Sequence, residues 1–211
     1  MTAQLRAFPV LVLIALAWIA IPSGASANHV GPYGNGVPYK WQNLQSLGGS
    51  ISYSLCPLGE PYAQDWRWGI ENWDSYLSTR MDFNEFTCGQ SVRTYVTWES
   101  ADECGLTVFG KPATACWTAT DATWQPQGGY FLLDEAEIPF DVSYKAQSLS
   151  NRTQLSAHEW GHNLSLDHHP YDNSCSLPGV MAYVNAQPPC FYVPAGSEIQ
   201  TVECVVYDLL P

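Results

Sequence analysis

Basic side chains are scarce in this 211-residue chain. Eight Lys and Arg residues stand against twenty Asp and Glu residues, which gives a formal net charge of -12 at pH 7. A surface of this charge does not bind nucleic acid by neutralising its phosphates, so nucleic-acid partners are excluded. The sequence also has no internal repeat and no low-complexity linker, which leaves a mature chain of one domain's length.

Long apolar runs are missing outside the N-terminal 27 residues. The apolar run at 8–21 is too short for a comfortable membrane span. It is followed by Ala25-Ser26-Ala27, which has the small-x-small pattern of a signal-peptidase site. A retained membrane anchor is the alternative to cleavage. We expect residues 1–27 to be a secretory signal peptide, and an extracellular chain from Asn28 without stable membrane association.

Cysteine pairs with the Cys-x-x-Cys spacing are missing, so a zinc ribbon is not indicated. The chain has seven cysteines, all after the expected signal peptide. In a secreted chain they predict disulfide bonds, and the odd number leaves one thiol over. Local pairs such as Cys104–Cys116 and Cys175–Cys190 are expected, while spacing alone leaves the connectivity open.

Histidine is scarce as well, with five in the chain, yet three of them fall within residues 158–168. His158 and His162 are four apart, so on a helix they lie one above the other and can bind one metal ion. Glu159 is placed to contact a water molecule at that metal. His168 can supply a third nitrogen and leave one position open. Asp167 is an alternative third ligand, and histidines that serve only packing are the alternative to a metal site.

This stretch resembles the zinc-binding helix of the metzincin endopeptidases. Residues 158–168 read HEWGHNLSLDH, which is similar to the HExGHxLGLxH pattern of the matrixins. Residues 179–183 read GVMAY and resemble the Met-turn that follows that helix. The segment between the two stretches is longer than in typical matrixins and contains Cys175. In these two features it resembles the corresponding segment of the adamalysins.

The resemblance implies a role for each residue of the site. Neutral imidazoles of His158, His162 and His168 would hold one catalytic zinc, and Glu159 would take a proton from the attacking water and pass it to the leaving amine. Met181 would form a hydrophobic floor below the metal, and Tyr183 would lie near the substrate cleft. The histidines of a second, structural zinc in animal matrixins are missing, so we expect one zinc.

Ser165 stands where the matrixins have glycine. If the helix simply continued, His168 would point about 240° away from the direction of His162, so the chain must turn between them. A left-handed residue makes such a turn, which costs an L-residue about 1–2 kcal/mol and glycine nothing. Asn163 is an alternative left-handed residue, although it comes early. If Ser165 is left-handed, Ser165→Gly stabilises the protein by up to about 1 kcal/mol and Ser165→Val weakens zinc binding.

The resemblance also implies an α+β, zincin-like fold for residues 28–211. Its parts are a twisted mixed sheet, a backing helix, a zinc-binding helix and a C-terminal helix, after an irregular arm at 28–40. The pattern itself predicts strands at 51–55 and 92–98, because apolar residues alternate there. Helical spacing recurs in three places: Trp66, Ile70, Trp73 and Leu77; residues 150–164; and Ile199, Val202 and Val206.

The middle of the chain is less regular. Residues 102–129 are predicted to be a long loop with one short strand at 106–109. Strands are predicted at Tyr130–Leu133 and at 138–140, and by resemblance this segment would be the edge strand that aligns extended substrate. Four acidic residues could contribute to a calcium site, although no calcium-binding loop pattern is present and a solvated acidic surface is favoured: Asp134, Glu135, Glu137 and Asp141.

The sequence as a whole predicts a secreted, monomeric, zinc-dependent endopeptidase that acts on protein or peptide substrates. One alternative is a secreted zinc-containing binding or toxin module without turnover. The other is a disulfide-stabilised structural protein in which the motif arose by chance. Zinc content separates the structural protein from the other two, and peptide hydrolysis separates the enzyme from the binding module.

Overall fold

The structure is a computed structural model that describes residues 31, 36–44, 49–55, 58, 61–77, 81–98, 107–108, 111–112, 114–168, 179–181 and 193–207. The expected signal peptide at 1–27, most of the arm and Tyr183 lie outside these residues. None of the described helices has both the length and the hydropathy needed to cross a membrane.

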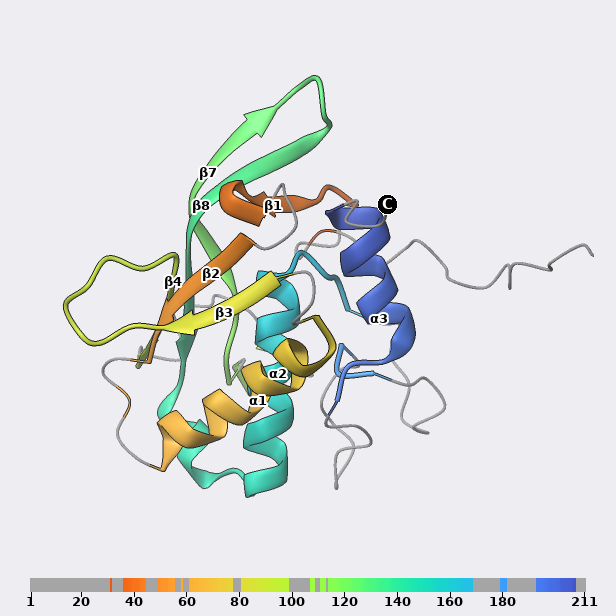
Figure 1. Ribbon diagram of the computed structural model, residues 1–211. Coiled ribbons are helices and arrows are strands. Elements are labelled where there is room, and N and C mark those ends of the chain that lie inside the picture. Colours follow the sequence, from red (N-terminus) through yellow and green to blue (C-terminus); the bar gives the residue numbers. More distant parts are fainter. Residues whose placement is uncertain are drawn as a thin grey trace, which may run out of the picture.

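One six-stranded mixed sheet forms the centre of the molecule (Figure 1). Its order is β1-β8-β4-β2-β3, and β7 pairs with β8. The strands are β1 (Tyr39–Trp41), β2 (Gly49–Ser54), β3 (Met81–Glu85), β4 (Thr94–Trp98), β7 (Thr118–Gln125) and β8 (Tyr130–Phe140). All pairs in it are parallel except β7 with β8. Two short strands, β5 (Thr107–Val108) and β6 (Lys111–Pro112), pair separately.

Helices accompany this sheet, in agreement with an α+β fold. They are α1 (Tyr62–Leu77), α2 (Leu149–Asn163) and α3 (Gly196–Gln200), which continues as a π turn, η3 (Thr201–Val206). Two short 3-10 turns, η1 (Gln42–Leu44) and η2 (Val142–Ala146), complete the described elements. The sheet and helices match the parts expected from the sequence, with parallel pairing dominant in the sheet.

The two long helices cover one face of the sheet. Trp66 of α1 packs on Phe140 of β8, with ring centroids 5.4 Å apart. Trp160 of α2 packs on Tyr53 of β2 and Phe83 of β3, at 5.3 and 5.4 Å. The strand registers put Tyr53, Phe83 and Phe140 on the same face, so α1 and α2 share it.

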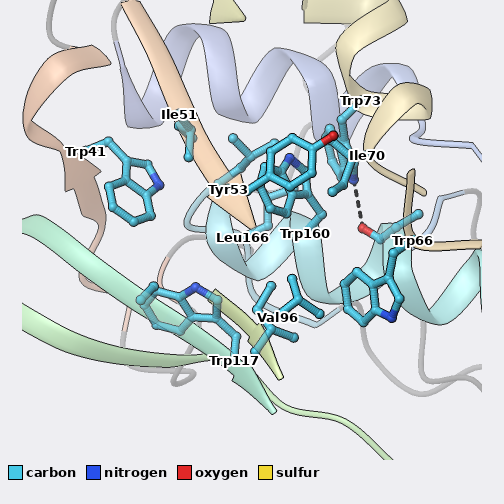
Figure 2. Packing of buried hydrophobic residues seen from close by; sticks show 14 of the residues in the cluster. Trp41, Ile51, Tyr53, Trp66, Ile70, Trp73, Val96, Trp117, Trp160 and Leu166 are labelled. Atoms are coloured by element: carbon cyan, nitrogen blue, oxygen red, sulfur yellow. Dashed lines mark hydrogen bonds between the residues drawn. The ribbon is translucent and has the colours of Figure 1, made fainter. Parts of the chain in front are cut away.

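Close contact between α1 and α2 follows from the sequence of α1. Its apolar stripe is buried as predicted, including Trp66, Trp73 and Leu77. The Trp73 indole donates a hydrogen bond of 2.7 Å to the carbonyl of Ala157 in α2, drawn as the dashed line in Figure 2. This bond fixes the metal-site helix against α1 in the centre of the core.

Gly69 allows the two helices to approach this closely, and its replacement should separate them. An added Cβ at Gly69 would overlap Ser156 Oγ and lie 2.6 Å from the backbone nitrogen of Ala157. We expect Gly69→Ala to destabilise the protein by roughly 1–3 kcal/mol, as overpacked cores do. Urea unfolding measures the change. Gly196→Ala is the control, because a Cβ there has open space, and equal effects of both variants would contradict the prediction.

The structure corrects two predictions for the middle of the chain. Residues 118–125, predicted as loop, form strand β7, which the pattern missed because most of its side chains are exposed and no apolar alternation is required. Tyr130–Leu133 and 138–140 belong to one strand, β8, which is not an edge strand. It pairs with β4 and β1 on one side and with β7 on the other. The antiparallel edge is therefore β7.

Smaller differences concern ends and cysteines. Helix α2 begins at Leu149 with Ser148 as its N-cap, close to the predicted start. Residues 81–85 form a strand, β3, that was not predicted. Cys88 and Cys116 each take part in a disulfide bond. The expected pairs Cys104–Cys116 and Cys175–Cys190 each include residues outside the described part of the chain.

Candidate metal centre

Helix α2 carries the first two histidines of the site in its last two turns. His158 and His162 are both buried, and their ring centroids are 4.9 Å apart. Trp160 lies between them in the sequence and faces the sheet. One side of the helix is thus held in the core, and the spacing of four residues presents both imidazoles together on another side.

The helix ends in a turn that brings His168 back to the first two histidines. Ser165 has φ 73°, the left-handed conformation predicted from the need to turn. Its N–H donates to the His162 carbonyl at 2.8 Å, and the Leu166 N–H donates to the Gly161 carbonyl at 3.0 Å. These two bonds form a Schellman motif. Among the described residues, Ser165 is the only non-glycine residue with positive φ.

The hydroxyl of Ser165 has a partner that the sequence did not indicate. Ser165 is fully buried, and its Oγ accepts a 2.7 Å hydrogen bond from the backbone N–H of Tyr39, the first residue of β1. Its carbonyl accepts another bond, of 2.8 Å, from the N–H of Gly31. The turn before His168 is therefore attached to the N-terminal segment of the protein. A glycine at position 165 would lack the bond to Tyr39.

This hydrogen bond reverses the effect expected for Ser165→Gly. Relief of the left-handed strain gains about 1–2 kcal/mol, whereas loss of a buried acceptor costs about 1–3 kcal/mol. We now expect Ser165→Gly to destabilise the protein modestly, on the order of 1 kcal/mol. Ser165→Ala should be worse because it loses the bond and keeps the strain, and Ser165→Val should be worst.

Thermal unfolding of the four proteins with zinc present tests this order. The difference in melting temperature between the glycine and alanine variants reports the strain at position 165, since neither variant has the hydroxyl. A glycine variant more stable than wild type would show that the bond to Tyr39 is weaker than the strain.

The three imidazoles converge on one point. His168 Nε2 lies 3.1 Å from His158 Nε2 and 3.2 Å from His162 Nε2. All three ligand atoms lie within 4.8 Å of one another. A tetrahedral zinc ion with Zn–N bonds of about 2.0–2.1 Å holds its nitrogens about 3.3 Å apart. The residues present therefore fit a metal ion held by three histidines.

Backbone carbonyls set the tautomers of the two helical histidines. His158 Nδ1 lies 2.8 Å from the Val180 carbonyl, and His162 Nδ1 lies 2.8 Å from the Leu166 carbonyl. A carbonyl only accepts, so each Nδ1 carries the proton and each Nε2 offers a lone pair. Burial, and the proximity of His158 and His168, lower the pKa of His162. A neutral imidazole, the form that binds metals, is thus favoured.

Glu159 is buried beside the first ligand without an ionic partner in the described part of the chain. Burial raises the pKa of its carboxyl from 4.5 to about 8. Its Oε2 finds no hydrogen-bond partner among the described residues. A buried carboxyl oxygen without a partner is costly for the fold and is typical of functional sites.

The raised pKa of Glu159 predicts a pH dependence for the metal-free protein. The carboxyl ionises near pH 4.5 when unfolded and near pH 8 when folded. The folded state therefore holds its proton more tightly, and stability falls as pH rises from about 4.5 to 8. Metal-free Glu159→Gln should lack this loss. In urea unfolding, the free energy of unfolding of the variant should rise relative to that of wild type across this range, and the two should be equal below pH 4.5. A difference in unfolding free energy that does not change with pH would contradict the raised pKa of Glu159.

Met181 lies against α2, and its role as a floor below a metal stays a prediction. It is fully buried, and an added Cβ at Gly161 would overlap its Sδ and lie 3.1 Å from Trp73 Cζ2. Gly161, one residue before His162, thus leaves room for the methionine under the helix. Tyr183 lies outside the described residues, so its place near a cleft stays a prediction.

Asp167 and the four acidic candidates for calcium do not join this group. Asp167 Oδ1 accepts a 2.7 Å hydrogen bond from the His168 N–H. Among the described residues, His158, His162 and His168 are the one group of histidine, cysteine or carboxylate side chains that could hold a metal. The acidic side chains accept hydrogen bonds or ion pairs from separate residues: Asp134 from Arg93, Glu135 from Thr120, Glu137 from Thr97 and Asp141 from Ser143.

Two supporting residues were not identified from the sequence. The Asn163 carbonyl accepts a 2.7 Å bond from the Trp41 indole, and its Oδ1 accepts a 2.9 Å bond from the Trp117 indole. Glu198 is buried under the Met181 segment and accepts a bond from its backbone. An available signal for Glu198 was its position four residues before Val202, on the buried stripe of the last helix, where a carboxylate needs partners.

The chain has no match among models of protein families, and no curated protein matches it. The site is therefore supported by its own geometry: three convergent imidazoles, two tautomers set by carbonyls and a buried carboxyl next to the first histidine.

Proposed function

We propose that this protein is a secreted zinc-dependent endopeptidase of the metzincin type. The observation that carries the proposal is the His158, His162 and His168 cluster together with the buried carboxyl of Glu159, whose Oε2 has no hydrogen-bond partner among the described residues. Three neutral imidazoles with an open position are typical of catalytic zinc sites, whereas structural zinc sites are closed by four protein ligands. The methionine below the helix and the mixed sheet with one antiparallel strand support the same family.

The chemistry can be assigned to particular residues. Zinc, when bound by the three histidines, would supply a Lewis acid that polarises a peptide carbonyl and lowers the pKa of water to about 7. Glu159 would accept the proton of the attacking water and return it to the leaving amine.

Strand β7 is the edge along which an extended peptide would lie. It pairs with β8 alone among the described strands, so its second edge offers backbone groups for a further antiparallel strand. In Figure 1 the β7–β8 hairpin extends beyond the rest of the sheet. This assigns the substrate-aligning role to residues 118–125 instead of the segment expected from the sequence.

Incubation of purified, zinc-loaded protein with a diverse peptide mixture tests the proposal. Mass spectrometry should find new cleavage sites that disappear with a chelator and return when zinc is restored. Glu159→Gln, purified in the same way, controls for a contaminating protease. Cleavage by both proteins at equal rates would contradict the assignment of Glu159.

The two alternatives give different outcomes in the same experiment. A binding or toxin module without turnover would hold zinc and leave every peptide intact. A structural protein with a chance motif would hold no zinc after loading. The buried carboxyl of Glu159 favours the enzyme, because neither alternative needs a buried acid beside the ligands with an oxygen that lacks a hydrogen-bond partner.

A further inference from the structure

A buried carboxylate on the last helix binds the backbone below the metal centre. Glu198 of α3 is 2% exposed. Its Oε1 accepts a 2.8 Å hydrogen bond from the Met181 N–H. Its Oε2 accepts bonds from the N–H groups of Val180, at 3.1 Å, and Ala195, at 2.7 Å. Three N–H donors satisfy a carboxylate well, so this group is held in one orientation.

The segment that Glu198 holds also holds a ligand. The Val180 carbonyl accepts the 2.8 Å bond from His158 Nδ1. That carbonyl and the Met181 N–H, which donates to Glu198, belong to one peptide group. A continuous chain of hydrogen bonds therefore runs from the Glu198 carboxylate through a single peptide group to the His158 imidazole.

The backbone of the preceding residue is shaped for this contact. Gly179 has φ 121°, and an added Cβ there would overlap the Glu198 carboxylate. Any side chain at position 179 would push the carboxylate away from the Val180 and Met181 N–H groups. The close approach of Glu198 thus depends on glycine at this position.

We infer that Glu198 is a positioning residue for the metal centre, acting on His158 through the Val180–Met181 peptide group. A carboxylate at the N–H end polarises the peptide group and makes its carbonyl oxygen a stronger acceptor. The stronger acceptor fixes the Nδ1–H tautomer of His158 and raises the basicity of the nitrogen that faces the metal. This role rests on the metal centre proposed above and does not require that the protein hydrolyse peptides.

His162 supplies an internal comparison. Its Nδ1 donates to the Leu166 carbonyl, which lies in the turn after α2 and is no part of the segment that Glu198 binds. A change at Glu198 should therefore act on His158 and leave His162 nearly unaffected. General loosening of the fold would change both imidazoles.

Glu198→Gln is the sharper variant, because its amide keeps the shape but removes the charge and one acceptor oxygen. Glu198→Ala removes all three bonds. Chelator competition should show zinc binding about 10–100-fold weaker in the alanine variant, as for loss of outer partners of metal ligands, and an intermediate loss in the glutamine variant. In NMR spectra of the zinc-loaded glutamine variant, the His158 Nδ1–H resonance should shift while that of His162 stays in place.

Asp65→Asn is the matched control, because Asp65 is also a buried carboxylate and pairs with Arg152 at 2.5 Å, away from the Met181 segment. It should lower the melting temperature and leave zinc affinity and both imidazole resonances unchanged. If folded Glu198→Gln keeps the zinc affinity and the His158 resonance of wild type, the role of Glu198 is overturned, while the metal centre itself is not. Equal shifts of both imidazoles would also overturn it. A wild-type protein that binds no zinc would overturn the metal centre as well.

Discussion

Glu159→Gln should lose most peptide hydrolysis and keep its zinc. Glutamine has the shape of the protonated carboxyl but cannot accept a proton from water. A positioned general base contributes about 10²–10⁴-fold to rate, so kcat should fall by about that factor. The metal ligands are unchanged, since the Nδ1 partners of His158 and His162 are the Val180 and Leu166 carbonyls.

The measurement is kcat on one cleaved peptide, together with the zinc content of the same preparation. The variant should also fold as well as wild type, because Glu159 Oε2 makes no hydrogen bond to any described residue. Turnover within a few-fold of wild type would show that another group takes the proton. A loss of zinc along with activity would instead place Glu159 among the ligands.

His168→Ala should abolish tight zinc binding, and Asp167→Asn should not. The structure places His168 Nε2 3.1 and 3.2 Å from the Nε2 atoms of His158 and His162, and Asp167 is not part of the group. Loss of a direct ligand should exceed the 10–100-fold loss of affinity typical for an outer partner. His162→Ala should behave like His168→Ala, because each supplies one of three nitrogens.

Metal analysis of the pure proteins gives the answer directly. Wild type and Asp167→Asn should each hold one zinc per chain, and the two histidine variants should hold little after dialysis. Asp167→Asn keeps an oxygen that can accept the bond from the His168 N–H, so the turn should survive in the control. If His168→Ala retained zinc and Asp167→Asn lost it, Asp167 would be the third ligand in place of His168. Two tightly held zinc ions in wild type would contradict the single centre.

The turn at Ser165 shows how far local reasoning reaches. A helix that presents His158 and His162 cannot also present His168 unless the chain reverses, and few residues lie between. Helix geometry thus required a turn, and the resemblance to the matrixins, which have glycine at this position, indicated Ser165 as its left-handed residue, with Asn163 as the alternative. The bond between Ser165 and Tyr39 was not predictable, because the two residues are far apart in the sequence and a backbone N–H is common to nearly all residues.

Strand β7 shows where pattern reasoning fails. The apolar stripe of α1 was predictable because four buried side chains must lie on one face of a helix. Strand β7 is held mainly by its backbone bonds to β8, and most of its side chains are exposed, so its sequence needs no alternation. The antiparallel edge was consequently predicted at β8, the better-patterned strand beside it.

Side-chain type and local geometry were enough to predict much of the metal centre. These predictable parts are the two histidines on one side of a helix, the turn before the third histidine, the third histidine and the acid next to the first one. The backbone groups that hold these side chains became visible only in the fold: the Val180 and Leu166 carbonyls, and the peptide group bound by Glu198. Backbone donors and acceptors are nearly the same at every position. Their pairing over long distances is settled by packing and leaves no pattern in the sequence.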